Sequence, residues 1–169
     1  TVSYTAAWWN WERWQQELDY MAMNAINMPL FSVGLDGVWY NTLLRFNFTE
    51  EEARAFLTGP GHSAWQWMQN IQSYGGPLPK SVIDKHVALG KKILARQLEL
   101  GMQPIQQGFS GYVPRELQKK YPQAKISMKR KWCGFDGTAQ LDPTDPLFHE
   151  MGLAFLEEQD KLFGSYGVY

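Results

Sequence analysis

The sequence predicts an α/β fold made of about four consecutive strand–helix units. Short apolar or alternating segments recur along the chain, and the first three are each followed by an amphipathic stretch that is long enough for a helix. Capping residues mark where these helices start or stop. Since strands that alternate with helices form parallel sheets through right-handed crossovers, the predicted order is βαβαβαβ in one parallel sheet.

The first unit joins a short strand to a tryptophan-rich helix. Residues 1–7 alternate between apolar and polar side chains, which is typical of a strand. Asn10 is suited to cap a helix over residues 11–25. The apolar residues that recur at helical spacing and predict its buried face are Trp14, Leu18, Met21 and Ala25. Four of the eight tryptophans lie at this junction, namely Trp8, Trp9, Trp11 and Trp14.

The second unit contains a long excursion between its strand and its helix. Residues 26–34 indicate a strand buried on both faces, although Pro29 is unfavourable in a central strand. We expect short helices over residues 37–46, from the capping box at Thr49 to Leu57, and over residues 64–71. An excursion of this length at the carboxyl end of a strand is usually functional.

The third unit begins with a long helix. Ser81, with Asp84 at capping-box spacing, is expected to start this helix, and Gly101 to end it. A strand over residues 102–109 follows. The residues predicted to form the core face of the helix are Ile83, Val87, Leu94 and Leu98.

The last unit leads to the predicted fold class. A small helix over residues 114–120 and a basic loop over residues 125–131 precede a long helix, capped by Asp145 and ended by Gly164. Residues 165–169 are predicted to be the fourth strand. A (β/α)₈ barrel needs eight such units and about 250 residues. We therefore expect residues 1–169 to be a TIM-barrel segment of about four βα units, the N-terminal part of a catalytic barrel domain.

Composition excludes several classes of function. The net charge is −1, with 16 basic and 17 acidic residues, which argues against a nucleic-acid partner. No apolar run approaches the ~18 residues of a membrane span. Glycine-rich phosphate loops are absent, and the single cysteine rules out an internal disulfide. The three histidines have no metal-ligand spacing, so we expect neither a metal nor a cofactor.

Aromatic residues follow each of the first three predicted strands, where ligands sit in a barrel. Tyr4 lies on the first strand with its polar tip at that end and Trp8 directly follows it, while Trp65 comes after the second strand and Trp132 after the third. This distribution favours a site that stacks sugar rings, although each ring could instead pack its own loop. Two carboxylates, Asp36 and Asp136, are placed to act as an acid–base couple or as loop caps.

Four long motifs carry a resemblance to a known family. They are YTAAWWNWERWQQELDYMAMNAINMPL, LTGPGHSAWQWMQN with GGPLP, GMQPIQQGFSGYVP, and LDPTDPLF. They resemble the α-N-acetylglucosaminidases, glycoside hydrolase family 89, nearly end to end. The resemblance implies an exo-acting, retaining hydrolase that removes terminal α-linked N-acetylglucosamine from glycans.

The resemblance also assigns roles to residues. Tyr4, Trp65 and Trp132 match aromatic positions that line the family's sugar pocket. The two catalytic glutamates of the family would lie beyond Tyr169, so no catalytic residue is expected in this chain. Where the family usually has glycine-x-glutamate-alanine, this chain has Gly34-Leu35-Asp36-Gly37, and the shorter Asp36 is the expected contact to a sugar hydroxyl.

Partners and location follow from the same resemblance. The partners would be a glycan and either the remainder of the barrel or a second copy, because a half-barrel leaves strand edges unpaired. A bacterial member would be exported to the periplasm or the exterior, and an animal member would be lysosomal. The alternatives are a non-catalytic carbohydrate-binding module and a (βα)₄ scaffold whose aromatic residues are all core.

Overall fold

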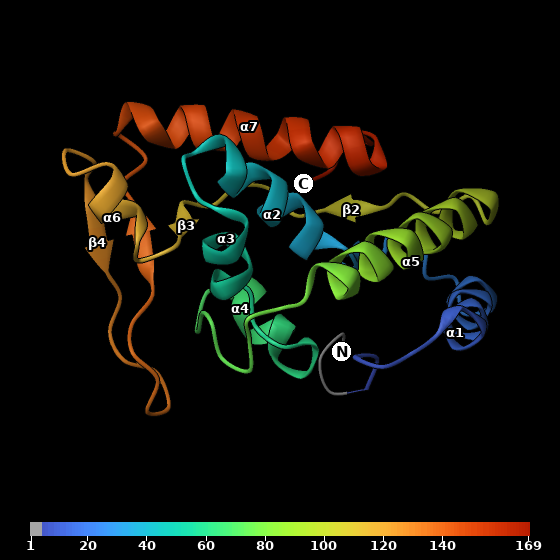
Figure 1. Ribbon diagram of the computed structural model, residues 1–169. Coiled ribbons are helices and arrows are strands. Elements are labelled where there is room, and N and C mark those ends of the chain that lie inside the picture. The colour runs from blue at the N-terminus through green and yellow to red at the C-terminus, as the bar shows by residue number, and fades with distance from the viewer. Residues whose placement is uncertain (1–4) are drawn as a thin grey trace.

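A computed structural model describes residues 5–169 and shows helices arranged around two small sheets (Figure 1). The helices are α1 (Trp11–Met23), α2 (Leu35–Arg45), α3 (Glu50–Phe56), α4 (Ser63–Trp67), α5 (Lys80–Glu99), α6 (Leu117–Lys120) and α7 (Pro146–Phe163), with a 3₁₀ turn over Pro60–His62. The strands are β1 (Leu30–Phe31), β2 (Ile105–Gln106), β3 (Tyr112–Val113), β4 (Ile126–Met128) and β5 (Ala139–Leu141). None of the described helices is both long and apolar enough to cross a membrane.

The two strands predicted within residues 26–34 and 102–109 pair in parallel, as the sequence predicts. Leu30 pairs with Ile105, and Phe31 pairs with Gln106, so each strand is shorter than expected. The backbone N–H of Gln106 donates to the carbonyl oxygen of Val168 at 2.9 Å, which places Val168 beside β2. Residues 165–169 form no regular strand, however, because this contact is not extended into a ladder. The strand predicted over residues 1–7 lies largely outside the described residues.

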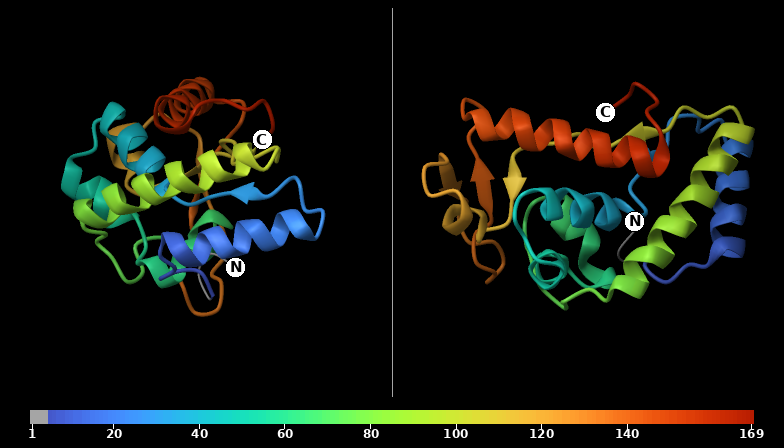
Figure 2. Two further views of the ribbon diagram at one scale, coloured as in Figure 1. Left: turned by 90° about the vertical axis from the view of Figure 1, so that its right-hand side faces the viewer. Right: turned by 45° about the horizontal axis from the view of Figure 1, so that its top comes forward.

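One face of the parallel pair is covered and the other is open. Phe31 and Gln106 are buried, and the Phe31 ring meets the Phe163 ring of α7 edge to face at 5.0 Å. Leu30 points the other way and is 66% exposed. Figure 2 shows α1 beside α5, and α7 crossing the molecule on the other side of α2. The face of the strand pair that carries Phe31 is therefore covered by α7, and the face that carries Leu30 is exposed.

Two glycines allow α5 to approach its neighbours closely. A Cβ on Gly90 would overlap the carbonyl oxygen of Val33, and a Cβ on Gly37 would overlap the Val87 side chain. Both positions therefore need glycine for lack of space, although glycine lowers helix propensity. These two close approaches, of Gly90 to Val33 and of Gly37 to Val87, hold the start of α2 and the carboxyl end of β1 against the middle of α5.

Most predicted helix starts are confirmed. Asn10 Oδ1 accepts from the backbone N–H of Arg13 at 3.1 Å, and the Thr49–Glu52 capping box is complete. Asp145 accepts from the N–H of Leu147 at 2.9 Å at the start of α7. The cap predicted at Ser81 is wrong: α5 begins at Lys80 after the extended Pro79, which places Ser81 inside the first turn.

The second sheet was not predicted. Strands β3, β5 and β4 pair antiparallel in that order, and β4 lies within the basic run expected to be a loop. Only the pairing of β4 with β5 makes this polar segment a strand. Of the residues predicted to form the core face of α5, Ile83 and Leu94 are buried, but Leu98 is 42% exposed.

Candidate functional site

Two tryptophan rings from distant parts of the sequence meet in space. Trp65 lies on α4 and Trp132 in the loop between β4 and β5, and their ring centroids are 5.1 Å apart with planes inclined at 39°. Both side chains are half-buried, so part of each ring remains accessible. Figure 1 shows the β4–β5 loop extending on the side where α4 lies. The structure thus brings together two of the residues that the sequence predicts for sugar binding.

The ring pair continues into a longer aromatic cluster. Trp132 stacks on Phe135 with a centroid distance of 6.3 Å and an angle of 22°. Phe135 meets Tyr74 edge to face at 4.9 Å, and Tyr74 meets His62 in the same way at 4.7 Å. Three separate segments therefore contribute rings to one surface. Flat apolar rings of this kind suit the apolar faces of a sugar.

A buried glutamine fixes α4 and so the Trp65 ring that it carries. Gln66 is 1% exposed, and its Oε1 accepts from the backbone N–H of Thr58 at 2.9 Å. Its Nε2 donates to the carbonyl of Phe56 at 2.9 Å and to the hydroxyl of Tyr112 at 3.4 Å. Burial raises the pKa of the Tyr112 phenol, which stays neutral and donates to the carbonyl of Ile71 at 2.8 Å. No sequence pattern identifies Gln66, because a glutamine between two tryptophans gives no sign that it is buried.

A second set of polar contacts fixes the loop that carries Trp132. Thr138 donates from its hydroxyl to the carbonyl of Gln69 at 2.7 Å. Arg115 donates from Nε to the carbonyl of Gly137 at 2.8 Å and from Nη2 to the carbonyl of Asp136 at 2.9 Å. Arg115 is not recognisable from the sequence either, since a single arginine after a strand is most often a surface charge.

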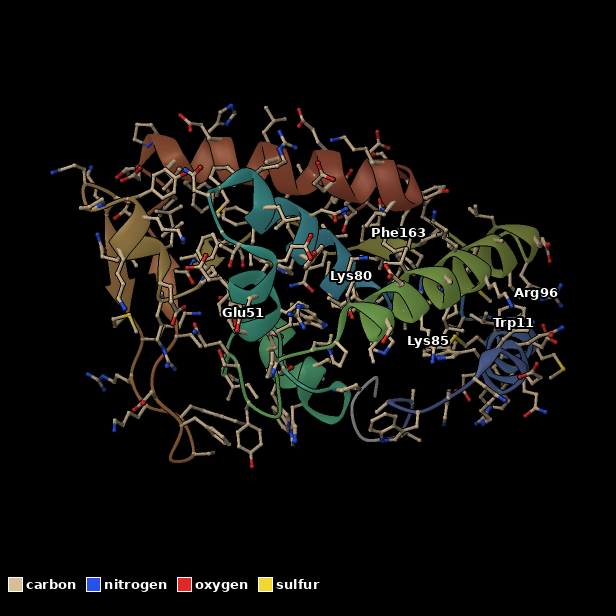
Figure 3. All side chains as sticks on the ribbon, viewed as in Figure 1. Trp11, Glu51, Lys80, Lys85, Arg96 and Phe163 are labelled. Atoms are coloured by element: carbon tan, nitrogen blue, oxygen red, sulfur yellow. The ribbon has the colours of Figure 1, made fainter. Side chains whose placement is uncertain are left out.

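The larger of two cavities lies away from the tryptophan pair. It has a volume of about 540 Å³ and lies between α1, α5 and the loops around Thr58 and Ser32. Figure 3 shows the side chains of Trp11 on α1 and Lys85 on α5, which both border it. A second cavity has a volume of about 250 Å³. Tyr74 and Phe135 of the aromatic cluster line it, together with Arg115. We place the candidate site at the ring pair and this smaller cavity, because those residues come from the loops that follow two different parallel strands.

The two candidate carboxylates do not form a couple. Asp36 lines the larger cavity, is 5% exposed, and its Oδ2 lies 2.6 Å from Nδ1 of His86. Asp136 lines the smaller cavity and pairs with Lys131 at 3.1 Å, which lowers the pKa of that carboxyl. Each carboxylate therefore has its own basic partner in its own place, which argues against joint acid–base catalysis.

Tyr4, the third aromatic residue predicted for sugar binding, lies outside the described residues. Within residues 5–169, no three His, Cys, Asp or Glu side chains gather in a group that could hold a metal ion.

Comparison with known proteins decides the family. The model of the alpha-N-acetylglucosaminidase (NAGLU) tim-barrel domain matches residues 1–169. The chain belongs to this family. Human alpha-N-acetylglucosaminidase is 35% identical over 173 residues, which cover 100% of this chain and 23% of the human protein.

Solved structures of the family match over the whole chain. A family 89 glycoside hydrolase from Clostridium perfringens, in complex with 2-acetamido-1,2-dideoxynojirmycin, is 35% identical with a TM-score of 0.94. The match covers 100% of this chain and 20% of that one. A variant of the Clostridium perfringens enzyme with two glutamate-to-glutamine substitutions, in complex with its substrate GlcNAc-alpha-1,4-galactose, matches equally well. The chain thus spans about a fifth of the length of these relatives.

Proposed function

We propose that the whole protein is an exo-acting, retaining α-N-acetylglucosaminidase and that this chain supplies aromatic walls of its sugar pocket. The observation that carries the proposal is the contact between Trp65 and Trp132, two rings held 5.1 Å apart by separate loops. Membership of the family, and a whole-chain likeness to a glycosidase whose structure holds an α-linked N-acetylglucosamine substrate, support it.

The reaction would need acids that this chain does not supply. In a retaining glycosidase one carboxylic acid protonates the leaving oxygen, while a carboxylate attacks the anomeric carbon and forms a covalent intermediate. We assign both to glutamates beyond Tyr169. Trp65, Trp132 and Tyr4 would hold the ring of the terminal sugar.

Asp36 has a different place in the proposal. Its Oδ2 is taken by His86, so a sugar hydroxyl would have to use Oδ1 or the His86 ring beside it. Since both residues line the larger cavity, we propose that Asp36 contacts the glycan only if the glycan extends into that cavity.

The remainder of the barrel is the proposed partner of the open strand face. Leu30 is 66% exposed and β1 and β2 pair over only two residues each, which leaves an unstable sheet in water. Further parallel strands of a (β/α)₈ barrel would cover Leu30 and extend this pair. A glycan with terminal N-acetylglucosamine is the proposed substrate, in the periplasm or exterior for a bacterial protein and in the lysosome for an animal one.

Hydrolysis of an aryl α-N-acetylglucosaminide by the full-length protein tests the proposal. Trp65→Ala and Trp132→Ala are expected to lower kcat/KM by at least about tenfold, and phenylalanine at either position should restore part of it. Tyr20→Ala, which removes an exposed ring from α1, is the control and should leave the kinetics unchanged. Wild-type kinetics in both tryptophan variants would contradict the sugar-binding role. Sugar binding by the whole protein without any hydrolysis would instead favour a carbohydrate-binding module.

A further inference from the structure

The loop that carries Trp132 depends on the rest of the protein for its position. Its β-ladder ends where the N–H of Lys129 donates to the carbonyl of Thr138 at 2.8 Å. Beyond that point Trp132 and Phe135 exchange backbone hydrogen bonds of 3.0 and 2.8 Å, closing a turn through Cys133 and Gly134. Most side chains from 129 to 137 are exposed. The loop therefore lacks a core of its own that could hold the Trp132 ring in place.

Arg115 fastens this loop at the residues between the turn and the ladder. Its guanidinium donates to the carbonyls of Asp136 and Gly137, the two residues that directly follow Phe135. A guanidinium is a rigid fork of donors, so two hydrogen bonds fix both the distance and the angle of the segment that it holds.

Arg115 is itself held against the segment that follows α4. Its backbone N–H donates to Oε1 of Gln72 at 3.2 Å, and Nε2 of Gln72 donates to Oε2 of Glu116 at 3.3 Å. Gln72 is buried, at 7% exposure, which keeps this junction fixed. A continuous set of hydrogen bonds thus runs from the segment after Trp65, through Gln72 and Arg115, to the loop that carries Trp132.

We propose that Arg115 is a positioning residue that sets the Trp132 ring against Trp65 and so shapes the sugar pocket. This inference rests on the proposed function for its effect on catalysis, but not for its effect on ring geometry. Arg115 touches the loop backbone and acts on the sugar only through Trp132.

Circular dichroism of the full-length protein tests the geometric part. Two indoles this close couple their excited states and give paired bands of opposite sign, which depend on ring distance and angle. The difference spectrum between wild type and Trp132→Phe isolates the contribution of this ring. Arg115→Ala is expected to lose the same bands, and Arg115→Lys, which keeps a single donor, to retain part of them. Arg130→Ala is the matched control, because exposed Arg130 lies on the same loop and makes no hydrogen bond or ion pair with residues 5–169.

Kinetics test the functional part. Because Trp132 would bind the sugar equally in the ground and transition states, Arg115→Ala should raise KM about tenfold with kcat changed less than about threefold. Arg130→Ala should change neither. Unchanged bands in a folded Arg115→Ala protein would overturn the inference. If the wild type proves to have no glycosidase activity, the proposed function fails while the circular dichroism bands still decide the role of Arg115.

Discussion

At the scale of single residues, buried polar groups set the geometry of the candidate site. Gln66 uses its amide oxygen and its amide nitrogen for buried hydrogen bonds to three residues, Phe56 and Thr58 at the end of α3 and Tyr112 on β3. Removing a buried partner leaves the others unsatisfied, which costs more than the bond itself contributes. The site therefore depends on residues that never touch a ligand.

Replacing Gln66 tests this dependence. Gln66→Leu keeps the approximate size of the side chain but removes the acceptor of the backbone N–H and the hydroxyl of Thr58. The carbonyl of Phe56 loses one of its two donors and keeps the N–H of Ser73. We expect a loss of about 2–4 kcal/mol in the local free energy of unfolding around α4. Hydrogen exchange of peptides over residues 56–72 in the full-length protein measures it. Gln16→Leu, at an exposed position of α1, should leave these peptides unchanged.

Asp145 makes the start of α7 sensitive to acid. Its carboxylate accepts from the backbone N–H groups of Lys125 and Leu147, and these bonds lower the pKa of Asp145 in the folded protein. A carboxyl with a lowered folded pKa stabilises the fold above its unfolded pKa of about 4, and this stabilisation is lost as the pH falls toward the folded value. Hydrogen exchange over residues 146–163, corrected for its intrinsic pH dependence, should therefore accelerate below about pH 4. Asp145→Asn keeps a capping oxygen and should weaken this acid dependence; an unchanged dependence would show that other carboxyls dominate.

At the scale of elements, the contact between α2 and α5 depends on missing side chains. Gly90 faces the backbone of Val33 directly after β1, and backbone cannot rotate away as a side chain can. Gly152 on α7 also lies inside a helix, but the nearest atoms to its Cβ position belong to the Phe109 ring, at 3.2 Å. The same glycine-to-alanine substitution can therefore be compared at Gly90, which faces backbone, and at Gly152, which faces a side chain.

Alanine at these two positions should have opposite effects. Alanine favours a helix over glycine by about 1 kcal/mol, so Gly152→Ala should be neutral or slightly stabilising. Gly90→Ala gains the same propensity but forces α5 away from β1, and we expect a net loss of about 1–3 kcal/mol. Hydrogen exchange of α5 peptides measures the difference. Equal protection in both variants would mean that α5 shifts freely.

The elements also show what the sequence could and could not predict. Helix starts at Asn10, Thr49 and Asp145 were predicted, because a cap is a contact between residues two or three apart. The antiparallel sheet was missed, because β4 is a strand only through its pairing with β5. Strand lengths were overestimated for the same reason: a strand ends where its partner ends.

At the scale of the whole molecule, the site depends on loops that meet across the fold. The sequence identified Trp65 and Trp132 as candidates by their places after strands, and their resemblance to a family sharpened this prediction. It could not show that the rings touch or that Arg115 and Gln66 hold them, since these are contacts between distant residues. It also left open whether Asp36 and Asp136 form an acid–base couple or cap their loops, and only the structure shows that His86 and Lys131 hold them at different cavities.

The open face of the parallel strands gives the last prediction. Large apolar side chains are exposed there and on the segment leading into β1, at Leu30, Met28 and Ile26. We expect the isolated 169-residue chain to self-associate through this face and to have no glycosidase activity. Leu30→Lys should shift the isolated chain toward monomer in sedimentation, because a charge is tolerated only on a face in contact with water.

The same substitution should act in the opposite direction in the full-length protein. If further barrel strands cover Leu30, Leu30→Lys buries an unpaired charge and should lower stability by several kcal/mol or prevent folding. Leu153→Lys, on the exposed side of α7, is the control and should be tolerated in both contexts. A Leu30→Lys protein that is stable at full length, with an isolated chain that is monomeric from the start, would show that the strand pair needs no partner. Opposite effects in the two contexts would locate the missing strands at Leu30.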